Sequence, residues 1–522
     1  MTHSHYGPDQ PEYQPPPPEA FHPDVYLPHP YPQPPARKGG HGKKIIAGVA
    51  LAAVVAGGAV AAYAYTVLAS SGIQPERVLP ANTVAFAKLD LDPAAGQKIA
   101  AYRLSTKFPA VSKGAADMDD AKDAILSEFF DEQSELDYTT EIKPWLGDRI
   151  AIAAVPNSAS EAGLDPVLVV AYTDEAKMKA AFSKAARTEH DFGYVTIDGY
   201  ALVSDSQSHA EAVLAGVRRG TLAGAEHYRA DLKALDGDQL AVGWADIEAV
   251  VTALKAGDRS GANSRLEGID RLDTLAAAKS RMIVGAHASS DYLEVSAISR
   301  QKVVDGAPRL AGKPVNGTLA KLAAADTTAA LEISGLGEAF KQVWAGASTA
   351  LGMGGDFEDF VEESGLQLPD DLVALFGSDA TVSLRLPQGA SGDPQIAAQV
   401  TTDDPDRALE VLDSLGLPFG FAPDSLHTQK TADGYLLSNS ASYDPRAPAG
   451  VPTLGADPAF QKAVPDRANA GLIGYLNLGG MLDADEHASA KDKADWKHVG
   501  SLGLSVVPTS DGSRINFRLT TR

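Results

Sequence analysis

Hydrophobic residues recur along this chain with two periods, and each period predicts one kind of element. Between Met178 and Ala185, four apolar residues stand at i, i+3, i+4 and i+7, the spacing of one buried helix face. Tyr200 and Leu202 alternate with Ala201 and Val203, as in a half-buried strand. The chain therefore mixes helices and strands.

One stretch has neither period. Residues 45–68, "IIAGVALAAVVAGGAVAAYAYTVL", carry no charge, and as a helix of about 36 Å they would cross a hydrocarbon core of about 30 Å. Arg37, Lys38, Lys43 and Lys44 precede it, so the positive-inside rule predicts a cytoplasmic N-terminus and an exported C-terminal part. Small-x-small triplets within 59–64 leave a cleavable signal peptide as the alternative.

Residues 1–44 are rich in proline, which removes backbone donors and fixes φ. We expect a disordered cytoplasmic tail. Its interleaved tyrosines would suit a cytoplasmic partner with an aromatic groove, whereas the simpler interpretation is a passive tail.

Two distant segments repeat the same pattern. "DGYALVSDS" begins at Asp198 and "DGYLLSNSA" at Asp433. "LDYTTEIKPWLGDRIAIA" from Leu136 corresponds to "LQLPDDLVALFGSDATVS" from Leu366, an offset of 230 residues that aligns Gly147 with Gly377. The helical stripe from Met178 recurs at that offset as Ala408, Val411, Leu412 and Leu415. Asp174 and Asp404 are the predicted N-caps of these two helices.

The correspondence extends along both segments. "TLAGAEHYRADL" from Thr221 aligns with "TLGADPAFQKAV" from Thr453, placing Tyr228 on Phe460. "LAVGWADIEAVV" from Leu240 aligns with "GLIGYLNLGGML" from Gly471, and each segment ends in a predicted hairpin, within 281–299 and 501–519. We infer an internal duplication.

These elements predict an α+β fold: two tandem homologous repeats, each with a largely antiparallel sheet and packed helices. The predicted organisation is a tail (1–44), a transmembrane helix (45–68), extracytoplasmic repeat 1 (73–302) and extracytoplasmic repeat 2 (318–522). The Gly- and Pro-rich stretch 303–317 is the expected junction.

Charge and composition narrow the function. The formal net charge is −23, and the charges of residues 1–44 cancel, so the excess lies on the exported part and disfavours nucleic-acid binding. The chain has no cysteine, which excludes disulfides, thiolate nucleophiles and cysteine-ligated zinc. We expect no cofactor and no metal.

Candidate chemistry is sparse. G-x-S-x-G, H-E-x-x-H and G-x-G-x-x-G are absent from the sequence. "DMDDAKDAILSE" at Asp117 departs from a calcium loop because Lys122 stands where the turn needs glycine, and "GDFEDFVEES" at Gly355 is interpreted as a helix surface. Seven histidines beyond the tail stand singly and are expected to be surface or structural residues: His190, His209, His227, His287, His427, His487 and His498. Four strand-end residues are interpreted as helix caps: Asp90, Asp246, Ser334 and Asn477. No catalytic, cofactor-binding or metal-binding residue is predicted.

The Pro-rich N-terminus, the single span, "LPANTVAFAKLDLDP" and "PWLGDRIAIA" together resemble an actinobacterial membrane-protein family known only as a domain of unknown function. The resemblance covers roughly residues 73–522 and implies a single-span envelope protein with an exported domain. It brings no catalytic or ligand residue. In the second repeat the signature weakens, since Trp145 corresponds to Leu375 and Arg149 to Asp379.

The leading hypothesis is a single-pass, non-enzymatic binding or scaffolding protein of the cell envelope. Its expected partners are the bilayer, through one helix, and an envelope protein or ligand, with any site in the groove between the repeats. Two alternatives stay open. One is an envelope hydrolase with dispersed carboxylates, and the other is a regulator that signals through the tail.

Overall fold

The computed structural model describes residues 73–90, 95–108, 127, 136–160, 162–188, 192–257, 279–301, 309–350, 365–387, 393–415 and 426–522. They belong to one unit, which spans Gly42–Arg522. The predicted tail (1–44), the predicted span (45–68) and part of the expected junction lie outside these residues. Among the helices that the model describes, none combines the length and the apolar character that crossing a membrane requires.

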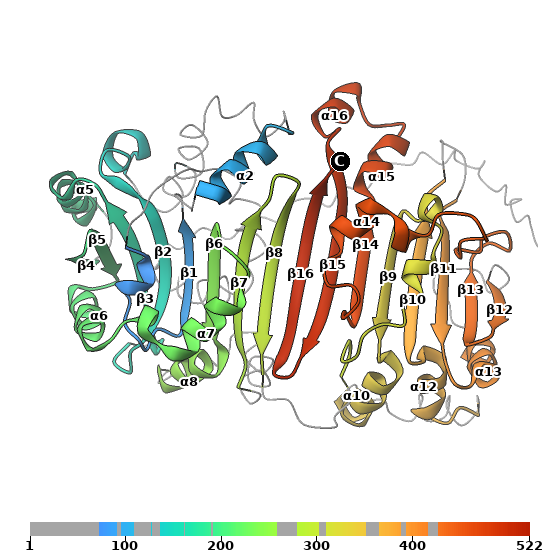
Figure 1. The fold of residues 1–522 in the computed structure, drawn as a ribbon. Helices are drawn as coiled ribbons and strands as arrows, with labels where there is room; N and C mark the ends of the chain where they lie inside the picture. Colours follow the sequence, from blue (N-terminus) through green and yellow to red (C-terminus); the bar gives the residue numbers. More distant parts are fainter. Residues whose placement is uncertain are drawn as a thin grey trace, which may run out of the picture. The chain divides into compact units, whose positions relative to one another are not determined.

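The described strands form one antiparallel sheet in the order β12-β13-β11-β10-β9-β14-β15-β16-β8-β7-β6-β1-β2-β3-β5-β4 (Figure 1). The first eight strands in the chain are β1 Ala85–Asp90, β2 Leu146–Pro156, β3 Leu164–Tyr172, β4 Gly193–Ile197, β5 Tyr200–Ser204, β6 Ala241–Asp246, β7 Arg281–Ala288 and β8 Tyr292–Arg300. The other eight are β9 Ala329–Ser334, β10 Asp379–Arg385, β11 Gln395–Thr401, β12 His427–Thr431, β13 Gly434–Ser438, β14 Leu472–Leu476, β15 Val499–Thr509 and β16 Gly512–Thr521. The predicted α+β class with a largely antiparallel sheet is confirmed.

Helices connect the strands. The α-helices are α2 Ala95–Ser105, α5 Glu175–Thr188, α6 Gln207–Arg219, α7 Glu226–Ala234, α8 Ile247–Gly257, α10 Leu336–Ala350, α12 Asp370–Phe376, α13 Pro405–Leu415, α14 Pro458–Ala463, α15 Leu478–Ala484 and α16 Ala490–Asp495. Short helical turns of other types are η1 Pro75–Arg77, η2 Tyr138–Ile142, η3 Leu222–Gly224, η5 Leu319–Lys321, η6 Ala324–Asp326 and η8 Leu454–Ala456.

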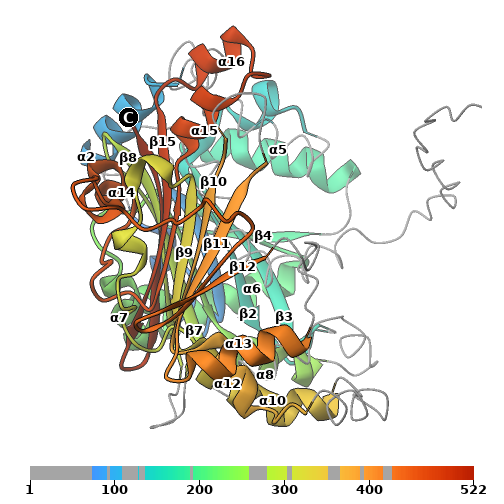
Figure 2. The same cartoon turned by 90° about the vertical axis from the view of Figure 1, so that its right-hand side faces the viewer.

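The two faces of the sheet carry different helices (Figure 2). One face, here called the α5 face, packs against α5, α8, α12 and α13 through side chains such as Leu89 and Val400. The other, here called the α7 face, packs against α7 and α14 through side chains such as Phe86 and Ile473. Because strand side chains alternate between faces, each strand contributes to two separate layers.

Strands β1–β8 (the first half) and β9–β16 (the second half) have the same internal order. From the centre outward, the first half runs β8-β7-β6-β1-β2-β3-β5-β4 and the second β16-β15-β14-β9-β10-β11-β13-β12. The halves meet where β8 pairs with β16, and Ser296 lies opposite Asn516. Residues are called equivalent below when they hold the same position in these two ladders.

Local details follow the sequence predictions closely. Asp174 Oδ1 accepts from Lys177 N and Asp404 Oδ1 accepts from Arg407 N, both at 3.0 Å, so both predicted N-caps are confirmed. Tyr228 and Phe460 are both fully buried. Each makes an edge-to-face contact, with Trp244 at 5.6 Å and with Tyr475 at 5.3 Å between ring centroids.

The alignment of the two "DGY" motifs is wrong by one residue. Asp198 and Gly199, with φ of 49° and 82°, form the two-residue turn between β4 and β5. In the second half the turn is Ala432-Asp433, since Thr431 pairs with Gly434. Tyr200 therefore joins the core on the α7 face, whereas Tyr435 joins the core on the α5 face. A slip of one residue moves a strand side chain to the opposite face.

Candidate functional site

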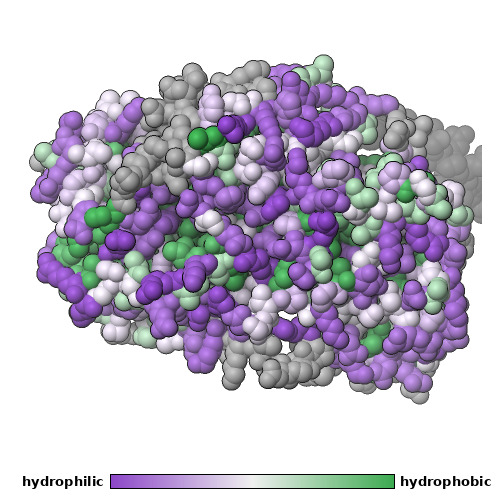
Figure 3. Space-filling view, in the orientation of Figure 1, coloured by the Kyte–Doolittle hydropathy of each residue, from purple (hydrophilic) through white to green (hydrophobic). Residues whose placement is uncertain are grey.

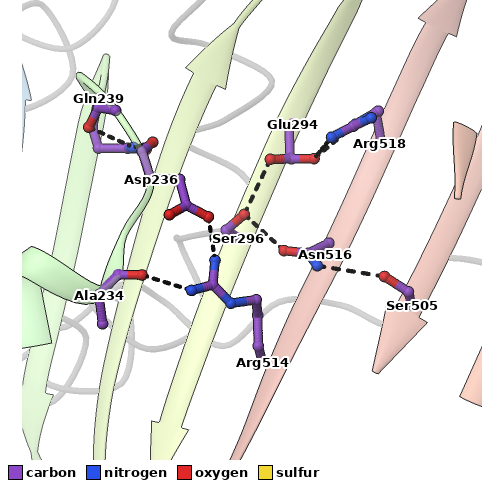
Figure 4. A network of polar contacts seen from close by, with 10 residues as sticks. Ala234, Asp236, Gln239, Glu294, Ser296, Ser505, Arg514, Asn516 and Arg518 are labelled. Atoms are coloured by element: carbon purple, nitrogen blue, oxygen red, sulfur yellow. Dashed lines mark hydrogen bonds and ion pairs between the residues drawn. The ribbon is translucent and has the colours of Figure 1, made fainter. Parts of the chain in front are cut away.

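The seam between the halves is filled rather than hollow. Ser296 Oγ donates to Asn516 Oδ1 at 3.0 Å, and Asn516 Nδ2 donates to Ser505 Oγ at 3.4 Å (Figure 4). All three residues are buried on the α7 face. At this point the two halves form a continuous ladder whose buried polar side chains are hydrogen-bonded to one another.

Charged side chains flank this seam in pairs. Glu294 on β8 binds Arg518 on β16 at 2.7 Å, and Arg514 reaches Asp236 at 2.6 Å and the carbonyl of Ala234 at 2.9 Å (Figure 4). These partners come from both halves. The contacts therefore join the halves, and they leave these charges engaged with each other rather than available to a ligand.

The α5 face of the second half is different, because it is apolar and partly exposed. One row of directly paired side chains crosses it from β10 to β8: Val382, Leu331, Gly474, Leu504, Phe517 and Val295. Val382, Leu331 and Phe517 keep 44%, 42% and 43% of their surface exposed. Seven neighbouring strands contribute to this surface: β8, β16, β15, β14, β9, β10 and β11. We call their uncharged side chains on the α5 face the apolar face.

No charged side chain interrupts the apolar face. Its members on β8, β16, β15 and β14 are Leu293, Val295, Ala297, Ser299, Ser513, Ile515, Phe517, Leu519, Leu502, Leu504, Val506, Pro508, Leu472, Gly474 and Leu476. Its members on β9, β10 and β11 are Ala329, Leu331, Ile333, Ala380, Val382, Leu384, Ile396, Ala398 and Val400. Only Ser299 and Ser513 offer a side-chain hydrogen-bonding group.

The opposite face of the same strands buries polar side chains as well as the apolar ones that pack against α14. On the α7 face the buried positions include Glu332, Thr381, Ser383, Ser505 and Asn516. Figure 3 views the molecule from the side of α7 and α14 and shows mostly hydrophilic residues there, with smaller hydrophobic areas. An antiparallel sheet that faces water on one side normally presents polar side chains there, so the exposed apolar side chains of the α5 face need an explanation.

Helix length explains part of the exposure. In the first half, α8 buries Ala85, Ala154 and Ala245 on the α5 face. The equivalents in the second half are Ala329, Leu384 and Leu476, which are only half-buried. The helix at the place of α8 is α15, with seven residues instead of eleven, and its side chains pack near Val499 and Leu293 instead.

The chemistry of the apolar face is limited to apolar contact. Its backbone groups are used in the sheet ladders, and its side chains carry no charge. Contiguous exposed apolar patches of this kind are rare on soluble proteins and mark binding surfaces. This surface can bind hydrocarbon, but it has nothing with which to orient a polar or charged group.

The structure confirms some of the helix caps predicted from the sequence and not others. Asp246 accepts from Ala249 N at 3.0 Å and Asn477 from Gly480 N at 2.8 Å, so these two caps are confirmed. Asp90 accepts from Gln74 Nε2 at 3.2 Å, and its predicted cap stays a prediction because residues 91–94 lie outside the described residues. Ser334 donates to the carbonyl of Lys313 at 2.5 Å and does not cap α10. His190 and nearly all of the segments at Asp117 and Gly355 lie outside the described residues.

The histidines also differ among themselves. His287 contacts Gln97, a structural contact of the expected kind, and His487 is exposed. His209 is the exception, because Asp165 and Asp205 both approach it. Asp205 and His209 are an i,i+4 pair that the sequence shows, whereas Asp165 on β3 is distant from both in the sequence.

Two buried carboxyl groups have perturbed acidity. Burial raises the pKa of Glu332, although the backbone N–H groups of Leu319 and Thr318 partly offset this. Burial likewise raises the pKa of Asp165, against a hydrogen bond from Asn157. In both cases desolvation, which disfavours the charged form, is the dominant cause.

Fold and surface together define an α+β protein built on one long antiparallel sheet, with an uncovered apolar region on one face. The chain belongs to the DUF3352 family, described as proteins of unknown function, whose model matches residues 45–415. Among curated proteins, none matches significantly. A solved structure titled "Structure of crystal form III of TP0453" aligns with 9% identity over 45% of this chain and 83% of that chain, at a TM-score of 0.22.

Proposed function

We propose that this chain is a non-enzymatic binding protein of the cell envelope, and that its apolar face holds a hydrocarbon chain of a lipid. The observation that carries the proposal is the uncharged, partly exposed face centred on Leu331, Val382 and Phe517. A protein partner would ordinarily be met by about one hydrogen bond per 100–200 Å² and by rim charges, which this face lacks. A hydrocarbon chain needs neither.

The sequence supports a position at the membrane. In the proposal, residues 45–68 form a single span, the tail 1–44 stays in the cytoplasm, and the sheet is exported, as the resemblance to actinobacterial envelope proteins implies. Only residues 69–72 separate the span from Ile73. At about 3.5 Å per residue, this tether keeps the beginning of the folded part within about 20 Å of the bilayer. Lipid chains are therefore the nearest apolar ligands.

We also propose that the two halves arose by duplication. Their equal strand order supports this origin. The equivalent glycines Gly147 and Gly377 sit at the same place: a Cβ on either would collide with the end of the neighbouring strand, at Ala171 or Thr401. In this interpretation both halves descend from one unit. The second half then lost the helical cover that α8 gives the first, which opened the apolar face.

The test replaces Phe517 by the photoreactive p-benzoylphenylalanine in the full-length chain, expressed in cells. After irradiation, the expected product is an adduct between residue 517 and a lipid, identified by mass spectrometry of the digested protein. The same substitution at Leu331 should give the same class of adduct, because the two residues lie in one row of the sheet.

Trp496 provides the matched control, since it is also aromatic and 43% exposed but follows α16, contacts Phe108 and is not a member of this row. Lipid adducts at 517 and 331 but not at 496 support the proposal. Adducts with another protein, or with a second copy of this chain, would assign the face to protein binding instead. Equal lipid labelling at all three positions would mean that the face has no special affinity.

A further inference from the structure

Three potential metal ligands converge beside the outer strands of the first half. Asp165 begins β3, Asp205 follows β5, and His209 lies in the first turn of α6. His209 Nδ1 lies 2.5 Å from Asp205 Oδ1 and 3.1 Å from Asp165 Oδ1. One ligand atom from each residue fits within a group whose members lie no more than 4.8 Å apart.

The buried carboxylate of this cluster is incompletely satisfied. Asp165 is 2% exposed, and its Oδ2 accepts from Asn157 Nδ2 at 2.8 Å. Its Oδ1 has no hydrogen bond, because its approach to His209 is close in distance but not in geometry. A single ring nitrogen carries at most one proton, so it cannot donate to two carboxylates at once. An unpaired buried carboxylate oxygen is costly, and a cation placed here would compensate it.

The arrangement also suits a metal in its surroundings. Asn157 Nδ2 donates to Oδ2 of Asp165 and so orients the carboxylate, as hydrogen-bond donors beside metal-binding carboxylates do. Ser206 caps α6 through His209 N at 3.2 Å and so fixes the backbone of the ligand. The side chains of Asp205 and His209 are 42% and 23% exposed, which gives an ion a route from solvent.

We propose that Asp165, Asp205 and His209 bind one divalent transition-metal ion of the zinc class. An oxygen–oxygen–nitrogen set with an open position is a ligand group that such ions accept. With bonds of about 2.0–2.1 Å, tetrahedral ligands lie about 3.3 Å apart. The Asp165–His209 separation already approaches this value, and the exposed Asp205 must move outward by somewhat under 1 Å. The positive end of α6 opposes a cation, and the two carboxylates outweigh it.

The second half provides an internal comparison. The position equivalent to Asp165 is Gln395, and the residue that follows β13, as Asp205 follows β5, is Asn439; neither is charged. No described helix takes the place of α6 after β13. Asn439 Oδ1 instead accepts from Ile396 N at 2.8 Å. The proposed site therefore belongs to the first half alone, and it predicts one ion of this kind per chain.

The experiment uses the full-length protein, stripped with a chelator and titrated with ZnCl2 by calorimetry, with MnCl2, MgCl2 and CaCl2 in parallel. The expected result is one zinc-binding event that D205N and H209Q each weaken at least tenfold. Zinc should also raise the thermal unfolding midpoint of the wild type but not that of H209Q. H487Q, which removes an exposed histidine distant from the cluster, should behave as the wild type.

The tail contains further histidines, including His3 and His5, and these remain in every variant. Zinc binding that persists unchanged in both D205N and H209Q would assign all of it to other groups and overturn the proposal. So would the absence of any zinc-binding event in the wild type. Because D205N changes an exposed side chain, its folding is expected to be preserved, and the result does not depend on the buried Asp165. Either outcome leaves the apolar face untouched.

Discussion

The two halves of the sheet have the same strand order but fill equivalent interior positions with opposite chemistry. In the first half, the buried Asp231 accepts from Trp244 Nε1 at 3.0 Å and from Arg281 and Arg300 at 3.0 and 2.6 Å. In the second half these four positions are occupied by neutral residues: Ala463, Tyr475, Ser501 and Thr520. There, Tyr475 and Ser501 share a hydrogen bond of 3.1 Å between their hydroxyl groups.

A second position shows the same contrast. Lys88 on β1 reaches Glu76 at 2.9 Å, which ties the strand to η1. The equivalent residue on β9 is Glu332, which accepts from the backbone of Thr318 and Leu319 at 2.8 and 3.0 Å, beside η5. The charge is reversed, yet each side chain anchors the same preceding turn. The fold therefore requires a connection at this point and not a particular charge.

The surfaces differ as well. Leu331 and Phe517 in the exposed row are equivalent to Ala87 and Ala297 in the first half. The larger apolar side chains therefore lie in the second half, where α15 covers less of the sheet than α8 covers in the first half. If exposure were only an accident of a shortened helix, smaller or polar residues would be expected to accumulate there. Their size favours selection for contact.

The largest predicted loss of stability comes from substituting Asp231, at the centre of the charged network of the first half. Asp231→Asn should lower the free energy of unfolding by about 3 kcal/mol, because it removes the buried charge that Arg281 and Arg300 share, although Arg300 keeps its second partner Asp511. Ser501→Ala, at the equivalent of Arg281, removes only a neutral hydrogen bond and should cost about 1 kcal/mol. Urea unfolding of the full-length protein measures both.

If Asp231→Asn and Ser501→Ala lowered the free energy of unfolding equally, the ionic network would stabilise the first half no more than the neutral hydrogen bond stabilises the second. That result would contradict the prediction. Arg514→Gln provides a control, because Arg514 holds the exposed Asp236 at the same seam. Exposed ion pairs contribute little, so its cost should stay well below that of Asp231→Asn.

Much of the local structure was predictable because it depends on neighbours in the sequence. The stripe from Met178 becomes α5, its equivalent becomes α13, and Asp174 and Asp404 cap them. Hairpins and their order also followed from period-2 alternation and turn residues. The "DGY" match failed because a short identical string does not fix which residues form the turn, and pairing by register does.

Relations between distant segments were not predictable. The sequence left open whether the halves face each other or lie apart, and the pairing of β8 with β16 depends on two edges that no local pattern specifies. Alternation in β9 or β14 identifies two faces but not which one is covered, so the apolar face was missed. Asp205 stands only four residues before His209, and this spacing was visible in the sequence. Asp165 is distant in the sequence and reaches the pair through the pairing of β3 with β5, which no local pattern specifies.

An intermediate effect is expected from Glu332. Glu332→Gln should cost about 1–3 kcal/mol near pH 4, since the amide places an NH2 group against a buried backbone N–H. The folded-state pKa of Glu332 is raised above its ordinary value of 4.5, chiefly by burial. Its contribution is thus fully present below pH 4.5 and declines as pH rises through the folded pKa. The difference between wild type and variant should shrink over that range.

Unfolding titrations between pH 4 and pH 8 measure this slope. Glu338→Gln, on the exposed surface of α10, is the control for the same change of side chain and should cost little, because Glu338 is exposed. A gap between wild type and Glu332→Gln that widens with rising pH would show that the carboxylate is stabilised in the folded state, contrary to the burial of this side chain.

The smallest effects concern the two equivalent caps, which differ in charge. Asp246→Ala and Asn477→Ala should each cost about 1 kcal/mol by removing the acceptor of a first-turn N–H. Asp246 adds a negative charge at the start of α8, so Asp246→Ala should cost a few tenths of a kcal/mol more. Asn477→Asp should therefore raise the thermal midpoint slightly and Asp246→Asn lower it. If both exchanges moved the midpoint in the same direction, charge at the helix start would not be what distinguishes the caps, and the two halves would be alike at this position.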